Sequence, residues 1–256
     1  MLKYLKNLTE EELLKFEKFI HSPYFNSNRN IVKLFTYLKE NIDHPGNDIP
    51  DREEAYYYVY QKIKYDDAKY RKLVSDFSKL FEKFLMYQKF EEQTPGNRIM
   101  LLTSLRKRGF AKRFETNYAD ITTLQSKSYS KDDDFYLNEI HLENEYYSFY
   151  FNRFQNEFAV CLQKKSDNLN YYFVFCKLHN FLEMFNNEIN KEIKSKFKKQ
   201  FYDEIISFVE ENRSEIQKNH PNLFIIYNVL QMYVTSDKIY LTELKEYLKE
   251  NRKFII

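Results

Sequence analysis

The fold class is decided most clearly by residues 66–85, which read DDAKYRKLVSDFSKLFEKFL. An α-helix turns once in about 3.6 residues, so apolar side chains spaced three and four residues apart share one of its faces. Asp66 or Asp67 can cap the helix by accepting a hydrogen bond from a backbone N–H of its first turn. The segment therefore predicts a long amphipathic helix. Its apolar face comprises Tyr70, Leu73, Val74, Phe77, Leu80, Phe81, Phe84 and Leu85.

The same periodicity extends from this helix toward the N-terminus. Thr9 opens a capping box that begins one helix, and Asn28 is expected to begin a second. Asp51 opens another capping box and a short third helix. Together with the helix at 66–85, these segments predict an N-terminal four-helix subdomain, residues 1–93.

A junction is expected at Thr94-Pro95-Gly96-Asn97, because Pro and Gly together end a helix and no comparable pair occurs later. Beyond it we expect a helical array, residues 98–256. No segment shows the period-2 alternation of a β-strand, so the chain is predicted to be all-α. Helices of the array are predicted over 98–108, 111–128, 132–164, 168–189, 191–212, 221–235 and 238–251.

Two parts of the chain resemble known families. Leu8 through Phe19, the segment Ser22-Pro23-Tyr24-Phe25-Asn26 and the stretch from Tyr65 to Leu85 resemble the start of an uncharacterised group of helical bacterial proteins, which has no assigned activity. Leu105-Arg106-Lys107-Arg108-Gly109-Phe110, continued to Tyr118, resembles a tetratricopeptide helix pair, with a small turn residue between two helices that carry aromatic residues. This second resemblance implies an α-solenoid-like array of antiparallel helices with a concave binding face.

Aromatic residues far outnumber glycines, since the chain has 23 Tyr and 24 Phe but only 3 Gly. Few backbone positions can then adopt a positive φ at low cost. Phosphate-binding loops, dinucleotide-binding turns and nucleophile elbows require such glycines, and none of their motifs occurs. We therefore expect no enzyme and no cofactor.

Histidines and cysteines offer two weak metal-site patterns. His141 with Glu145, and Cys176 with His179 and Glu183, each lie along one helical face. Three such ligands within two turns could hold zinc. Because Cys176 and His179 lie among phenylalanines and tyrosines, a packed core is the favoured interpretation, and we expect no metal.

Cysteine usage and hydropathy bear on the compartment. Cys161 and Cys176 form no C-x-x-C pair and are predicted to be buried free thiols in a reducing cytoplasm. The longest stretch without Lys, Arg, Asp or Glu, residues 219–236, is shorter than the roughly 20 apolar residues of a membrane span.

The sequence ends on three bulky apolar residues, Phe254-Ile255-Ile256. Free termini are usually polar, so these residues either dock on the preceding helix or indicate a truncated chain.

Charge is balanced overall but uneven along the chain. The formal net charge is +2, yet residues 98–131 hold eight basic and two acidic residues, and residues 132–160 hold seven acidic and one basic. Five cations form a basic lip that could bind an acidic peptide or nucleic acid phosphates. They could instead face the acidic neighbouring helix and hold the two helices in register. These cations are Arg106, Lys107, Arg108, Lys112 and Arg113.

Two further features could serve recognition. Lys69, Arg71 and Lys72 open the helix at 66–85, so a helix-turn-helix-like element near 51–90 could contact nucleic acid. Tyrosines also occur in runs that would suit a binding surface if exposed and a core if buried. The runs are Tyr56, Tyr57, Tyr58 and Tyr60, then Tyr146, Tyr147 and Tyr150.

The function expected from these features is a non-enzymatic scaffold that binds a protein or peptide partner. The alternative is a nucleic-acid-associated regulator that uses either the element near 51–90 or the basic lip near 106–113.

Overall fold

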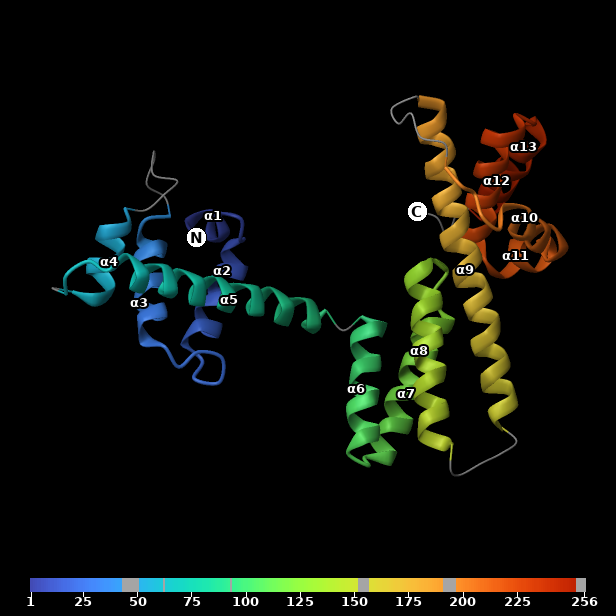
Figure 1. Cartoon of the computed structure of the whole chain (residues 1–256). Helices are drawn as coiled ribbons and strands as arrows, with labels where there is room; N and C mark the ends of the chain where they lie inside the picture. The colour runs from blue at the N-terminus through green and yellow to red at the C-terminus, as the bar shows by residue number, and fades with distance from the viewer. Residues whose placement is uncertain (43–50, 62, 93, 152–156, 191–196, 252–256) are drawn as a thin grey trace. The chain divides into compact units, whose positions relative to one another are not determined.

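The structure is a computed structural model that describes residues 1–42, 51–61, 63–92, 94–151, 157–190 and 197–251. Every regular element in these ranges is a helix, so the all-α prediction is confirmed for them. The chain divides into two compact units, Met1–Glu92 and Gln93–Ile256 (Figure 1). Within the described ranges, no helix has both the length and the apolar character needed to cross a membrane.

Unit 1 begins its helices where the sequence predicts caps. Thr9 Oγ1 accepts from the backbone N–H of Glu12, and Glu12 accepts from the backbone N–H of Thr9. Asn28, Asp51 and Asp66 likewise accept from first-turn N–H groups. The five helices described in this unit are α1 Leu2–Lys6, α2 Glu10–His21, α3 Arg29–Glu40, α4 Arg52–Tyr60 and α5 Asp67–Glu91. The short helix α1 is not predicted from the sequence.

The core of unit 1 is built around the ring of Phe16, which is fully buried. This ring meets four others from α3 and α5, with ring centroids 4.9 to 5.9 Å away. Three of these contacts are edge-to-face, and such contacts add to the free energy gained by burying the rings themselves. The four rings are those of Phe35, Phe77, Phe81 and Phe84.

The Ser22–Asn26 segment forms the corner between α2 and α3. The ring of Phe25 stacks on that of Phe19 with centroids 4.0 Å apart. Asn26 Nδ2 donates to the carbonyl oxygen of Ile20 at 3.0 Å, and Asn26 Oδ1 accepts from the backbone N–H of Asn28 at 2.9 Å. The contacts of Phe25 and Asn26 therefore fix the corner between α2 and α3.

Unit 2 begins at the predicted junction, where Thr94 caps a helix and Pro95 is its first residue. Proline suits this position because its missing N–H has no partner within the helix there. Helix α6 packs against α7 and α8, α8 against α9, α9 against α12, and α12 against α13. The helices are α6 Pro95–Lys107, α7 Ala111–Ser126, α8 Asp133–Tyr150, α9 Glu157–Asn190, α10 Tyr202–Glu211, α11 Arg213–Asn219, α12 Pro221–Thr235 and α13 Lys238–Glu250.

Three of the predicted helix limits in this unit are wrong. The break predicted between residues 164 and 168 falls inside α9, which is continuous there. The helix predicted over 191–212 is not helical at 197–201. The helix predicted over 132–164 is interrupted, because α8 ends at Tyr150 and Phe151 is a turn residue. Residues 191–196 and the C-terminal Phe254-Ile255-Ile256 lie outside the described residues.

A buried charge cluster joins α8 to α9 and explains the first of these errors. Lys164 Nζ on α9 lies 2.9 Å from Glu139 Oε2 and 2.6 Å from Glu143 Oε1 on α8. The two carboxylate side chains are only 9% and 4% exposed. Burial alone would lower the pKa of Lys164, but its bonds to the two carboxylates outweigh burial and raise it. One of the polar residues at the predicted break, Lys164, therefore has its charged partners inside the fold.

A buried histidine connects α8, α9 and α12. His220 Nδ1 lies 2.7 Å from the Tyr136 hydroxyl, and its ring stacks on that of Tyr171 with centroids 3.8 Å apart. Burial lowers the pKa of His220 to about 4, with a further lowering by Lys131 and an opposing effect of Glu215. The imidazole is therefore neutral in the folded protein near neutral pH.

We predict that Lys164→Met destabilises unit 2, because it leaves two buried carboxylates without their cation. Breaking a fully buried pair costs about 3–5 kcal/mol, and solvent reaches this ammonium, so we expect about 1–2 kcal/mol. Urea unfolding should show the loss, and Lys165→Met, which alters the next lysine of α9, should change the free energy by less than about 0.5 kcal/mol. If the two substitutions changed the free energy of unfolding equally, the stabilising role of the Lys164 charge cluster would be wrong.

We also predict that His220 makes unit 2 less stable in acid. The pKa in the fold is below the ordinary value of 6.5, so the unfolded chain takes up the proton first. The stabilisation is complete above pH 6.5 and is lost as pH falls to about 4, a loss of about 3 kcal/mol. His220→Asn, which keeps a polar atom near Nδ1, should remove this part of the pH dependence of urea unfolding, and His179→Asn, at an exposed position, should not.

Candidate functional site

The turn between α6 and α7 has a fixed backbone. Gly109 adopts a φ of 75°, which a residue with a Cβ adopts only with strain. Its N–H donates to the carbonyl oxygen of Arg106 at 3.1 Å, and the N–H of Phe110 donates to that of Leu105 at 3.0 Å. This pair of bonds is the Schellman arrangement that ends a helix. The basic lip therefore lies on an ordered turn.

Arg106 differs from the other four cations of the lip. Its Nε lies 2.8 Å from Glu145 Oε2, and its Nη2 lies 3.3 Å from Glu145 Oε1. Thr103 Oγ1 also donates to Glu145 Oε1, at 2.8 Å. The Arg106 and Glu145 side chains are 27% and 13% exposed. Arg106 therefore fixes α6 against α8, as the alternative interpretation of the lip predicts for all five cations.

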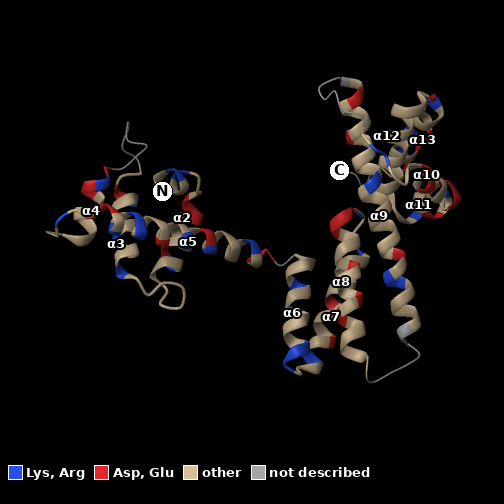
Figure 2. Ribbon diagram, in the orientation of Figure 1, with Lys and Arg blue, Asp and Glu red and all other residues tan. Residues whose placement is uncertain are grey.

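Lys107, Arg108, Lys112 and Arg113 are exposed instead, and in the ribbon of Figure 2 blue Lys and Arg positions gather at this end of α6. None of the four forms an ion pair with another described residue, and Arg108 donates only to the carbonyl oxygen of Ser104. The side chain of Phe110, between them, is 54% exposed. An anionic ligand could therefore reach these four cations without displacing a partner that the structure describes.

A groove runs between α6 and α8. Gly96 faces Asn138, since a Cβ built on Gly96 would lie 3.2 Å from Asn138 Oδ1. Thr103 likewise faces Glu145. In both pairs the α8 residue comes 42 positions after the α6 residue, so the two helices advance in the same direction and are parallel. Between them lies an open cavity of ≈ 540 Å³.

The lining of this groove suits an extended polypeptide. Ile99, Met100 and Leu137 supply apolar surface. Asn138, His141 and Asn144 also line it, and their side chains make no hydrogen bond to another described residue. Amide and imidazole groups of this kind can bond to the N–H and C=O groups of a bound peptide backbone. Thr103 and Glu145 line the groove at the end that leads to the basic turn.

The cations of the alternative nucleic-acid site are partly engaged within unit 1. Arg71 forms an ion pair with Asp67 of its own helix at 2.5 Å. Lys69 Nζ lies 4.1 Å above the ring of Tyr60. Lys72 is exposed and has no ion-pair partner among the described residues. This geometry leaves less free positive charge here than at the α6–α7 turn.

The metal-site patterns do not assemble, because no group of three or more possible ligands lies together among the described residues. The Glu145 carboxylate is paired with Arg106, so it is not free to bind a metal ion together with His141. His179 lies 3.6 Å from Glu183 on the surface of α9. The cysteines are free thiols, and burial raises the pKa of Cys161 to about 12 and also raises that of Cys176, so both thiols stay protonated.

The tyrosine runs divide between core and surface. Tyr56 is fully buried, whereas its neighbours Tyr57 and Tyr58 are 43% and 42% exposed. In the later run the ring of Tyr146 packs against that of Tyr118 with centroids 4.8 Å apart, and the Tyr150 hydroxyl donates to Glu115 at 3.1 Å. The runs therefore do not form one continuous exposed face.

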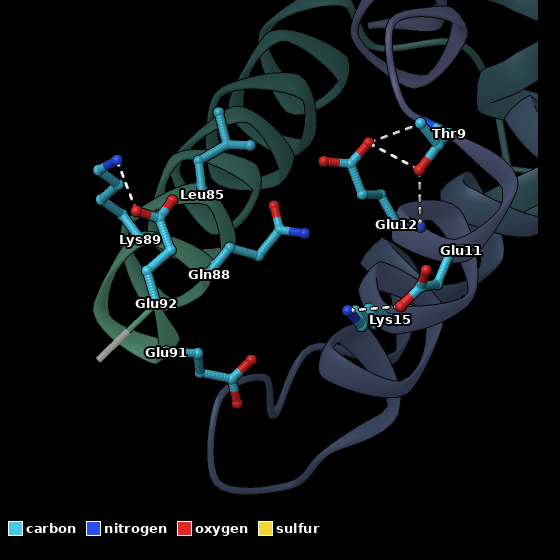
Figure 3. A pocket seen from close by; sticks show the side chains of 9 residues that line it. All are labelled: Thr9, Glu11, Glu12, Lys15, Leu85, Gln88, Lys89, Glu91 and Glu92. Atoms are coloured by element: carbon cyan, nitrogen blue, oxygen red, sulfur yellow. Dashed lines mark hydrogen bonds and ion pairs between the residues drawn. The ribbon is translucent and has the colours of Figure 1, made fainter. Parts of the chain in front are cut away.

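Unit 1 has a second groove, between α2 and α5 (Figure 3). Four of its charged side chains are paired with each other, Lys15 with Glu11 at 2.8 Å and Lys89 with Glu92 at 2.6 Å. Leu85 is the one apolar residue of its lining. A ligand would have to compete with these pairs, which makes this groove a weaker site than the one between α6 and α8.

The amide-lined groove is the part of the site that sequence reasoning missed. On α8 its polar residues lie at intervals of three and four, the same spacing that marks an apolar helical face. A polar face is ordinarily taken as solvated surface, so the pattern alone does not identify a groove. The parallel packing of α6 on α8 turns this face into one wall of the groove.

We predict that Arg106 and Glu145 are energetically coupled and that Lys107 is not. A cycle of Arg106→Gln, Glu145→Gln and the double variant should give a coupling of about 1–2 kcal/mol in urea unfolding, between the values for exposed and buried pairs. Lys107→Gln, one residue away, should change the free energy of unfolding by less than about 0.5 kcal/mol. A coupling near zero would show that the pair does not hold α6 on α8.

No protein-family model matches this chain, and neither a curated protein nor a solved structure matches it.

Proposed function

We propose that the chain is a non-enzymatic scaffold that binds an extended segment of a partner protein in the groove between α6 and α8. The observation that carries the proposal is this groove, in which three apolar residues line one cavity together with three polar side chains that bond to no other described residue. Apolar pockets give a bound peptide affinity, and polar groups beside them bind its backbone and fix its orientation.

The order of helix contacts supports a tetratricopeptide-like array. Helix α6 pairs with α7 and with the parallel α8, and α8 pairs with α9. In such arrays the first helices of successive pairs lie side by side and line one face. Here α6 and α8 hold those places, and the groove lies between them.

The compartment follows as part of the same proposal. Both cysteines are free thiols, and free thiols persist in the reducing cytoplasm. We therefore place the scaffold and its partner in the cytoplasm.

The test is selection of displayed random peptides on the full chain, followed by binding measurements with a blocked groove. Met100 is 62% exposed in the groove, so Met100→Arg should leave the fold intact while it places a bulky charge on the apolar wall. We expect selected peptides to bind this variant at least about tenfold more weakly, the loss typical of a central contact residue.

Leu124→Arg is the matched control, because Leu124 is 46% exposed on α7 and does not line the groove. It should leave peptide binding unchanged. Failure to select any peptide, or binding that Met100→Arg and Leu124→Arg affect equally, would contradict the proposal.

A further inference from the structure

We infer that the segment bound in this groove is acidic where it leaves the groove, and that Lys107, Arg108, Lys112 and Arg113 bind its carboxylates. The inference rests on the proposed function and names the chemical class of its ligand. It also separates these four cations from Arg106, which is bound to Glu145.

The first support is the position of the four cations relative to the groove. Gly96, Met100 and Thr103 line it from α6, and Lys107 follows at the same helical spacing, one turn beyond Thr103. From Gly96 to Lys107 the helix rises roughly 17 Å, the length of about five residues of extended peptide. A peptide that fills the groove therefore places its next residues beside the basic turn.

The second support is that two of these cations occupy unfavourable positions for the fold. Lys112 and Arg113 lie in the first turn of α7, which has no acidic residue. The N-terminal end of a helix carries partial positive charge, so cations there destabilise it. Neither side chain has an ion-pair partner among the described residues. An acidic ligand would supply the missing negative charge.

The third support is the opposite charge at the other end of the groove. Because α6 and α8 are parallel and Gly96 faces Asn138, the start of α8 lies at the start of α6. Asp133 and Asp134 are exposed there, one turn before the groove residue Leu137. These carboxylates repel an anion at that end and fix the direction in which an acidic peptide binds.

The same carboxylates favour a peptide over a nucleic acid. A nucleic acid strand carries a phosphate at every residue, so a strand in the groove would place some beside Asp133 and Asp134. A peptide can be acidic at one end alone. The experiment therefore compares two kinds of ligand, a peptide with a short acidic run and a nucleic acid that is charged along its whole length.

The experiment uses two displayed peptide libraries in which a random segment is followed by a run of glutamates in one and of glutamines in the other. Peptides selected on the full chain are labelled, and their affinities are compared by fluorescence anisotropy after the glutamate and glutamine runs are exchanged. We expect the glutamate forms to bind about tenfold more tightly, with the advantage decreasing as salt is added.

The discriminating variant is the double charge reversal Lys112→Glu with Arg113→Glu. It should remove the preference for glutamate and also raise the urea midpoint of unit 2, because it places acidic residues at the start of α7. Lys238→Glu is the matched control, since Lys238 is the exposed first residue of α13. It should raise the urea midpoint and leave the preference unchanged.

The outcomes separate the two proposals. If peptides bind and Met100→Arg weakens them, but glutamate and glutamine forms bind equally, the groove function stands and the acidic ligand is wrong. If the preference persists in the Lys112→Glu, Arg113→Glu variant, other residues select the acidic run. If a labelled oligouridylate binds more tightly than the glutamate peptides and depends on Lys112 and Arg113, the ligand is a nucleic acid. If neither library yields a binder, both proposals fail.

Discussion

The ion pair between Arg106 and Glu145 is the contact on which the groove and the basic turn both depend. It is bidentate, and Thr103 adds a third hydrogen bond to the same carboxylate. Glu145 has little access to water, so the bonds replace solvation that the carboxylate loses on folding. The pair holds α6 against α8 beside the groove, and Arg106 shortly precedes the glycine that reverses the chain into α7. The four exposed cations lie just beyond this contact, on the turn between α6 and α7.

The acidic residues of α8 explain why those four cations remain exposed. Opposite charge on neighbouring segments suggests that the basic segment is neutralised by the acidic one. Two of the carboxylates of α8, however, are buried against α9, where Lys164 binds both. Glu145 binds one further cation, Arg106, from the basic segment. Burial therefore decides which cations are paired, because a buried carboxylate requires a partner and an exposed one can rely on water.

Sequence periodicity and caps predict most of the helices, because these signals are local. Thr9, Asn28, Asp51 and Asp66 each cap the helix that follows them. The errors occur where a local signal is overridden by a distant partner. Lys164, Lys165 and Asp167 look like a polar turn, yet Lys164 lies on a helix because its charge is paired with residues 21 and 25 positions earlier. The groove could not be predicted for the same reason, since its walls come from α6 and α8.

Scarce glycine limits the chain less than the sequence suggests, and the exceptions show where it matters. Among the described residues, positive φ occurs at Gln61, Phe201 and Ser236 as well as at Gly109. The first three end or begin helices, where surrounding contacts can hold a strained residue at a cost of about 1 kcal/mol or more. Gly109 adopts the same conformation without that strain, in the turn that presents the four cations. Because the turn is unstrained and hydrogen-bonded, the backbone that carries the four cations has a defined conformation.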